Sequence, residues 1–183
     1  IADEAVSISR EQVAELIGVS ADEIVFTSGA TESLNIAIRG VANAYLSRGK
    51  HFVTLATEHK AVLDTCDFLV KQGFEVTKLQ VDSQGFPSLE ELNISLREDT
   101  VALICMLANN ETGRILPIAD YAQFARNKGV LVICDATQAV GKIPVNALEL
   151  GADLLAISAH KVYGPKGIGA LYVKRRNPRV RLA

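Results

Sequence analysis

The sequence has few cysteines, no excess of charge of one sign and no long apolar run. Three cysteines occur among 183 residues, and no two of them form a C-x-x-C pair. This spacing argues against a zinc site and against a disulfide framework. Cys105 and Cys134 lie inside apolar runs and Cys66 inside a helical pattern, so we expect all three to be structural residues.

The formal net charge is −2, and charges of both signs are mixed along the chain, which gives no reason to expect nucleic-acid binding. The one basic cluster, within residues 174–181, indicates a solvated segment. No apolar run approaches the roughly 18 residues of a membrane-spanning helix, and no signal segment opens the chain. We therefore expect a soluble, cytoplasmic protein, or an organellar one whose presequence is missing, with neither nucleic acid nor membrane as a partner.

Apolar residues make up 49% of the chain. Segments in which they recur at helical spacing alternate with short segments typical of strands. Helical spacing predicts helices at 6–17, 31–48, 61–72, 88–96 and 118–128, the fourth opened by a serine cap. Short apolar runs predict strands at 24–27, 52–55, 101–106, 130–134, 154–157 and 170–173, and a further strand is expected at 75–79. This alternation predicts an α/β fold in one domain, with a mostly parallel seven-stranded sheet flanked by helices on both faces. No G-x-G-x-x-G motif follows the first strand, which disfavours dinucleotide binding.

Two consecutive strand ends carry side chains suited to catalysis. Lys161 lies between the run 154–157 and a glycine-rich turn, and burial there would favour its neutral amine, which can form an imine. Asp135 follows the run 130–134, at the edge where open α/β sheets bind ligands. Taken singly, Lys161 could be a solvated loop cation and Asp135 a helix cap. Together they match the Schiff-base lysine and the acidic partner of the pyridinium nitrogen in pyridoxal phosphate (PLP) enzymes.

Five motifs, in the same order along the chain, then resemble one family. They are SGATES (28–33), EHKAV (58–62), NNETG (109–113), DATQ (135–138) and SAHKVYGPKGIG (158–169). The family is the cysteine desulfurases, fold-type I PLP enzymes of aminotransferase class V that supply sulfur for iron–sulfur clusters. The second and fifth motifs are most similar to the housekeeping and nitrogen-fixation branch of that family.

The resemblance implies PLP as the cofactor, Lys161 as the imine-forming lysine and Asp135 as the partner of the ring nitrogen. It implies that His59 stacks on the ring and shuttles protons, although a histidine at this place could by itself be a surface residue. Segment 28–31 joins a strand to a helix N-terminus, which favours an anion but also describes an ordinary helix start. The other residues implied in cofactor binding surround the phosphate (Ala30, Thr31, Ser158 and His160) or the ring hydroxyl (Asn110 and Gln138).

The implied reaction removes sulfur from L-cysteine, giving L-alanine and an enzyme-bound persulfide. The family is homodimeric and passes sulfur to an acceptor such as an iron–sulfur scaffold protein. Its nucleophilic cysteine lies on a loop C-terminal to the lysine, in a smaller domain, and none of the three cysteines here matches that position. We therefore expect residues 1–183 to be an incomplete PLP-binding large domain, without the N-terminal segment and the small domain, and inactive alone. The alternatives are another class V enzyme, an aminotransferase or a selenocysteine lyase, and a non-catalytic sulfur-transfer scaffold.

Overall fold

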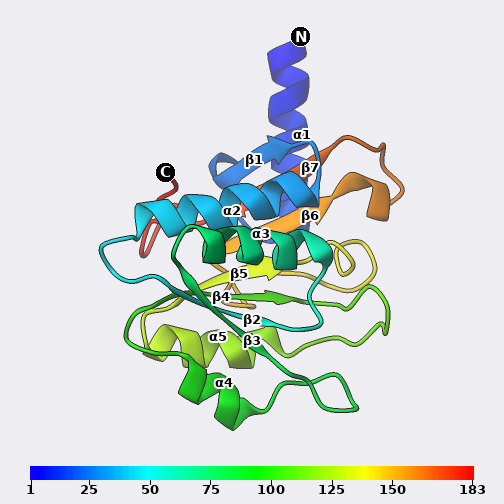
Figure 1. Cartoon of the computed structure of the whole chain (residues 1–183). Coiled ribbons are helices and arrows are strands. Elements are labelled where there is room, and N and C mark those ends of the chain that lie inside the picture. The colour runs from blue at the N-terminus through cyan, green and yellow to red at the C-terminus, as the bar shows by residue number, and fades with distance from the viewer.

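Seven strands form one sheet in the computed structural model, which describes residues 1–183 (Figure 1). In chain order the strands are β1 (Ile24–Thr27), β2 (His51–Leu55), β3 (Glu75–Leu79), β4 (Thr100–Met106), β5 (Leu131–Asp135), β6 (Leu154–Ser158) and β7 (Gly169–Val173). Their order across the sheet is β1-β7-β6-β5-β4-β2-β3. The predicted number of strands is confirmed, and every predicted strand overlaps an observed one.

The sheet is mixed but mostly parallel. Strands β3, β2, β4, β5 and β6 pair in parallel, whereas β7 runs antiparallel between β6 and β1. Because β7 reverses direction against both neighbours, β1 points the same way as β6. The carboxyl ends of β1, β2, β4, β5 and β6 therefore meet at one edge of the sheet.

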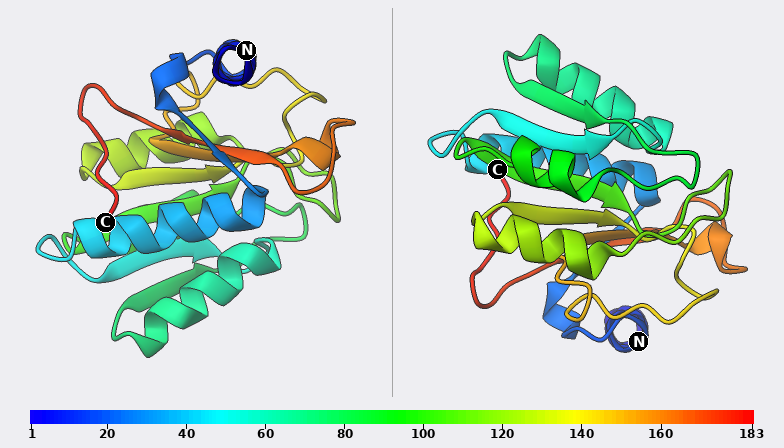
Figure 2. Two further views of the ribbon diagram at one scale, coloured as in Figure 1. Left: turned by 90° about the horizontal axis from the view of Figure 1, so that it is seen from above. Right: turned by 90° about the horizontal axis from the view of Figure 1, so that it is seen from below.

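Helices cover both faces, as predicted. The helices are α1 (Ala2–Leu16), α2 (Ala30–Ala44), α3 (Lys60–Lys71), α4 (Leu89–Ser95) and α5 (Ile118–Asn127). Helices α2 and α3 pack on one face, and α4, α5 and the C-terminal end of α1 pack on the other (Figure 2). The N-terminal half of α1 is exposed and projects away from the sheet (Figure 1). None of the helices has the length and apolarity needed to span a bilayer.

Two helix ends differ from the prediction. Helix α1 begins at Ala2, four residues earlier than the apolar pattern indicated, because its first turns are exposed and carry no apolar periodicity. Helix α2 ends at Ala44 rather than at 48. Beyond this end, Gly49 packs closely against residue 99, since a Cβ on Gly49 would be 2.0 Å from the carbonyl oxygen of Asp99. Two 3₁₀ turns, η1 (Ala21–Glu23) and η2 (Ala159–Lys161), were not predicted.

Two hydrophobic clusters lie on opposite faces of the sheet. Successive residues of β4 alternate between them: Leu103 and Cys105 belong to one cluster, Ala102 and Ile104 to the other. All residues of β2, β4, β5, β6 and β7 are buried. Burial on both faces explains why these strands read as continuous apolar runs rather than as alternating ones.

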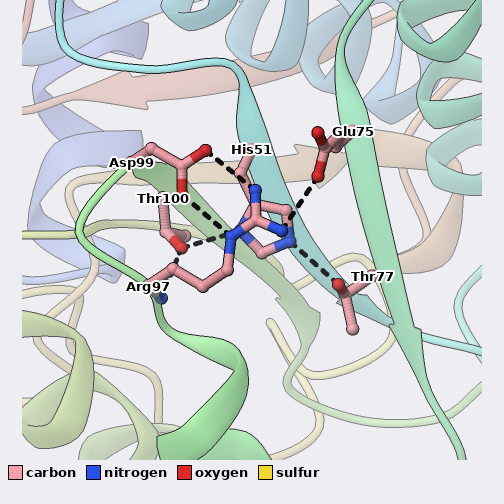
Figure 3. Close-up of polar contacts among 6 residues, drawn as sticks. All are labelled: His51, Glu75, Thr77, Arg97, Asp99 and Thr100. Atoms are coloured by element: carbon pink, nitrogen blue, oxygen red, sulfur yellow. Dashed lines mark hydrogen bonds and ion pairs between the residues drawn. The ribbon is translucent and has the colours of Figure 1, made fainter.

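A polar cluster around a buried histidine lies at the amino ends of β2, β3 and β4, at the edge opposite to the strand ends described above (Figure 3). His51, the first residue of β2, is 1% exposed. Its Nδ1 hydrogen-bonds Thr100 Oγ1 (2.7 Å), and its Nε2 hydrogen-bonds Thr77 Oγ1 (2.8 Å). Beside it, Arg97 forms ion pairs with Glu75 (2.9 Å) and Asp99 (2.8 Å). The cluster ties the starts of three strands together.

Candidate functional site

A pocket of about 460 Å³ opens where the five parallel strand ends converge. Its walls come from the segments that follow β1, β2, β4, β5 and β6. All nine residues predicted from the sequence line it: Ala30, Thr31, His59, Asn110, Asp135, Gln138, Ser158, His160 and Lys161. The structure thus brings together residues up to 131 positions apart in the chain. Their individual roles stay predictions.

One end of the pocket is the N-terminus of α2. Gly29 caps this helix with φ 155° and ψ 177°, a conformation open to glycine and strained for other residues. A Cβ on Gly29 would lie 3.7 Å from Ser158 Oγ, so its absence keeps space free between the helix and the end of β6. Ser158 Oγ in turn hydrogen-bonds Nδ1 of His160 (2.8 Å). Free N–H groups, a hydroxyl and an imidazole converge here, which suits an anion.

Glu32 also lines this end of the pocket and was not singled out from the sequence. Its Oε2 accepts a hydrogen bond from the backbone N–H of Ser28 (2.5 Å), and this bond lowers the pKa of the Glu32 carboxyl. Glu32 belongs to the first of the five motifs, so its place in the motif was the available signal. Its bond orders the connection between β1 and α2.

Asp135 supplies a buried acid to the pocket. It is the last residue of β5, it is 6% exposed, and its Oδ1 accepts a hydrogen bond from the backbone N–H of Thr137 (2.9 Å). Burial raises the pKa of this carboxyl, while the hydrogen bonds of Thr137 and the nearby His59 oppose that rise. A cationic group placed against Asp135 would stabilise its charged form.

His59 is the N-cap residue of α3. Its Nδ1 accepts a hydrogen bond from the backbone N–H of Ala61 (3.1 Å). A ring nitrogen that accepts a hydrogen bond carries no proton, so the neutral ring has its proton on Nε2. The cap therefore fixes both the orientation and the tautomer of the ring.

Lys161 lies at the end of η2, directly after β6, and its side chain is exposed at the pocket. The sequence predicted burial at this position, and that expectation is wrong for this chain. The strand before Lys161 is buried, but the 3₁₀ turn carries the lysine out of the sheet edge, so residues 1–183 do not remove the amine from water. Lys166, in the connection between η2 and β7, lines the same pocket and is exposed too.

The three thiols lie outside this pocket. Cys66, Cys105 and Cys134 are each 0% exposed and free of disulfides. Burial raises the pKa of all three, that of Cys66 to about 12. The expectation that they are packing residues is confirmed by their burial. No group of three or more His, Cys, Asp or Glu side chains is arranged to hold a metal ion.

Comparison with known proteins agrees with this geometry. A family model described as Aminotransferase class-V matches residues 2–179. A protein named cysteine desulfurase IscS, from Proteus mirabilis (strain HI4320), is 54% identical over 181 residues, which cover 99% of this chain and 45% of that protein. The chain therefore spans about half the length of the curated relatives it matches.

Solved structures show the same similarity. A structure described as a NifS-like protein matches with a TM-score of 0.93 and 42% identity, covering 98% of this chain and 50% of that one. A structure described as SspA in complex with cysteine matches with a TM-score of 0.89 and 40% identity, covering 93% of this chain and 49% of that one.

Proposed function

This chain belongs to the aminotransferase class-V family, and we propose that it carries the PLP-binding part of a cysteine desulfurase. The observation that supports this most is the convergence of nine predicted residues from five strand ends on one pocket. Similarity to a cysteine desulfurase over 99% of the chain supports the same assignment.

The pocket fits PLP at both of its ends. The N-terminus of α2, with Thr31, Ser158 and His160 around it, suits the phosphate, and the space beside Gly29 keeps that end open. Asp135 is a buried acid with room for a cationic partner, as the ring nitrogen of PLP requires. Asn110 and Gln138 would supply amide groups near the ring hydroxyl.

When bound, PLP supplies an electron sink for the bond that breaks at the substrate α-carbon. The residues of this chain would then hold and move protons. Nζ of Lys161, which is exposed at the pocket, would act as the base for the α-proton. His59 Nε2 carries a proton that it can exchange. The Asp135 carboxylate would stabilise the positive charge of the protonated ring nitrogen.

The proposed substrate is L-cysteine. A related structure contains cysteine, according to its description. In the proposed reaction, an enzyme thiol takes the sulfur atom of L-cysteine, so that L-alanine and an enzyme persulfide form. Because the three thiols of this chain are buried, we propose that the accepting thiol lies outside residues 1–183. We also propose that the protein forms a homodimer and that it passes the sulfur to an acceptor such as an iron–sulfur scaffold protein.

Labelling of the lysine tests this proposal. The protein is incubated with PLP, reduced with borohydride and digested, and the modified peptide is sequenced. We expect a pyridoxyl group on Lys161, because this lysine lines the same pocket as the anion-binding end and Asp135 and corresponds to the imine-forming lysine of the family that the motifs resemble. The matched control is Lys161→Arg, which keeps the charge but should not be labelled. Label on Lys166 or Lys60 in the unsubstituted protein would contradict the assignment.

A further inference from the structure

The connection between β2 and α3 carries a buried carboxyl group to which the proposed function gives no role. Glu58 lies in this connection, immediately before His59, and is 5% exposed. Its Oε1 accepts a hydrogen bond from the backbone N–H of Met106 (2.8 Å), whereas Oε2 is buried with no hydrogen-bond partner. Glutamate is almost never buried so completely unless it is paired. The burial of Glu58 therefore calls for a physical explanation.

The hydrogen bond to Met106 joins two walls of the pocket. Met106 is the last residue of β4, and its register partner on β5 is Asp135. On the other side, the backbone N–H of Glu58 donates to the carbonyl oxygen of Leu55, the last residue of β2. The Glu58 side chain thus crosses from the segment that carries His59 to the strand end beside Asp135.

The surroundings of Glu58 disfavour its charged form. Burial raises the pKa of the carboxyl well above its usual value, the negative charge of Asp135 on β5 adds to the rise, and the Met106 N–H opposes it. The other titratable groups that interact with Glu58 are thiols: Cys66 on α3, Cys105 on β4 and Cys134 on β5. None of these groups is a cation, so no positive charge on the packed elements compensates a carboxylate there, and the Met106 N–H is its one hydrogen-bond donor.

We propose that Glu58 is a positioning residue, held as a neutral acid, which ties the His59 connection to the end of β4 and leaves Asp135 as the carboxylate beneath the pocket. Two adjacent buried carboxyls titrate as a pair, and the first proton goes to the more poorly solvated member. Asp135 has the Thr137 hydrogen bonds and the nearby His59, whereas one oxygen of Glu58 has no partner. This inference about Glu58 rests on the proposed function only for the roles that it gives to His59 and Asp135.

Two measurements on the protein without PLP test the protonation of Glu58. At neutral pH, infrared spectroscopy should show a buried protonated carboxyl that is lost in Glu58→Gln and kept in Asp135→Asn. The surface substitution Glu11→Gln on α1 is the control and should also keep it. Loss in Asp135→Asn with retention in Glu58→Gln would place the proton on Asp135 and overturn the proposal, as would the absence of the signal from the unsubstituted protein.

The pH dependence of unfolding gives the second measurement. A raised pKa in the folded state means that stability is lost as pH rises from the unfolded pKa to the folded one. Above the unfolded pKa of about 4.3, the folding equilibrium constant of the unsubstituted protein should therefore fall relative to Glu58→Gln, by up to about tenfold per pH unit. A constant ratio between the two proteins across this range would contradict a neutral Glu58.

The positioning role is tested by PLP affinity. Glu58→Gln keeps an acceptor for Met106 N–H and should bind PLP as the unsubstituted protein does. Glu58→Met fills a similar volume without that acceptor, and we expect its PLP affinity to fall on the order of tenfold. Unchanged affinity in Glu58→Met would overturn the positioning role. If the unsubstituted protein bound no PLP, the proposed function would fail, while the infrared and unfolding results would still decide the state of Glu58.

Discussion

Cys66, Cys105 and Cys134 are each 0% exposed, and burial raises the pKa of all three thiols. The thiolate is the form that reacts, so a buried thiol with a raised pKa is a poor nucleophile. Cys105 and Cys134 are register partners on neighbouring strands and cannot swing out of the sheet. The burial that makes them good packing residues also makes them poor candidates for the proposed sulfur transfer.

We expect none of the three thiols to react rapidly with an aromatic disulfide reagent in the folded protein, and all three to react after unfolding in denaturant. The denatured sample is the control for the total number of thiols.

In an active enzyme containing this chain, Cys134→Ala should leave persulfide formation from cysteine intact, as judged by alkylation and peptide sequencing. Persulfide found on Cys134 would contradict both this prediction and the proposal of an accepting thiol outside residues 1–183.

At the scale of elements, the parallel strands β2, β3 and β4 are joined near their amino ends by the His51 cluster (Figure 3). Both ring nitrogens of His51 bond threonine hydroxyls, which can donate or accept, so the neutral ring is fully satisfied. Burial, together with the charge of Arg97, lowers the pKa of His51, whereas Asp99 and Glu75 oppose this effect.

We therefore predict that His51 makes the protein sensitive to acid. A lowered pKa in the folded state means that the stability His51 contributes is present above the unfolded pKa of about 6.5 and is lost as pH falls through the folded pKa. His51→Gln should be less stable at neutral pH by about 1–3 kcal/mol, because a buried hydroxyl loses a partner. It should also lose less further stability on acidification than the unsubstituted protein does.

Urea unfolding at neutral and mildly acidic pH measures both effects. Thr77→Ser keeps the hydroxyl that bonds His51 and is the matched control, which should retain the pH dependence of the unsubstituted protein. An equal loss of stability on acidification in His51→Gln and in the unsubstituted protein would show that other groups cause it.

At the scale of the whole molecule, the sheet separates two hydrophobic clusters. Ile17, where α1 ends, is 1% exposed and belongs to one cluster, and Ile38 of α2 is 0% exposed and belongs to the other. Each Ile→Val substitution removes one buried methylene group. We expect each to cost about 0.5–1.5 kcal/mol, and the two costs to add within about 0.5 kcal/mol because the sites share no contacts.

Urea unfolding of the two single variants and of the double variant tests this prediction, with fluorescence and circular dichroism as independent probes. Ile8→Val, on the exposed part of α1 (48% exposed), is the control and should change stability by less than about 0.5 kcal/mol. If the two probes gave different transitions, the two clusters would unfold separately. That result would contradict the cooperative unfolding expected of clusters that pack on one sheet.

Local patterns account for much of what the sequence predicted correctly. Continuous apolar runs placed the five strands that are buried throughout, because a strand buried on both faces needs no polar alternation. The candidate residues could be grouped at one edge because parallel strands bring their carboxyl ends together. Helix ends were less predictable: α2 ends at Ala44, four residues before the end that the apolar pattern indicated, and the chain then packs at Gly49 against Asp99, which lies 50 residues away.

The sequence by itself determined the α/β class, the number of strands and the burial of the thiols, since each depends on residues close together in the chain, and five motifs that resemble one family indicated nine residues that line the pocket. Tertiary structure alone decided that β7 lies antiparallel between β6 and β1, that Lys161 is exposed, and that Glu58 is buried beside Asp135. These features depend on strand order and on removal from water by elements distant in sequence. Desolvation and charge interactions act between residues that are far apart in the chain, so the sequence around one residue does not reveal them.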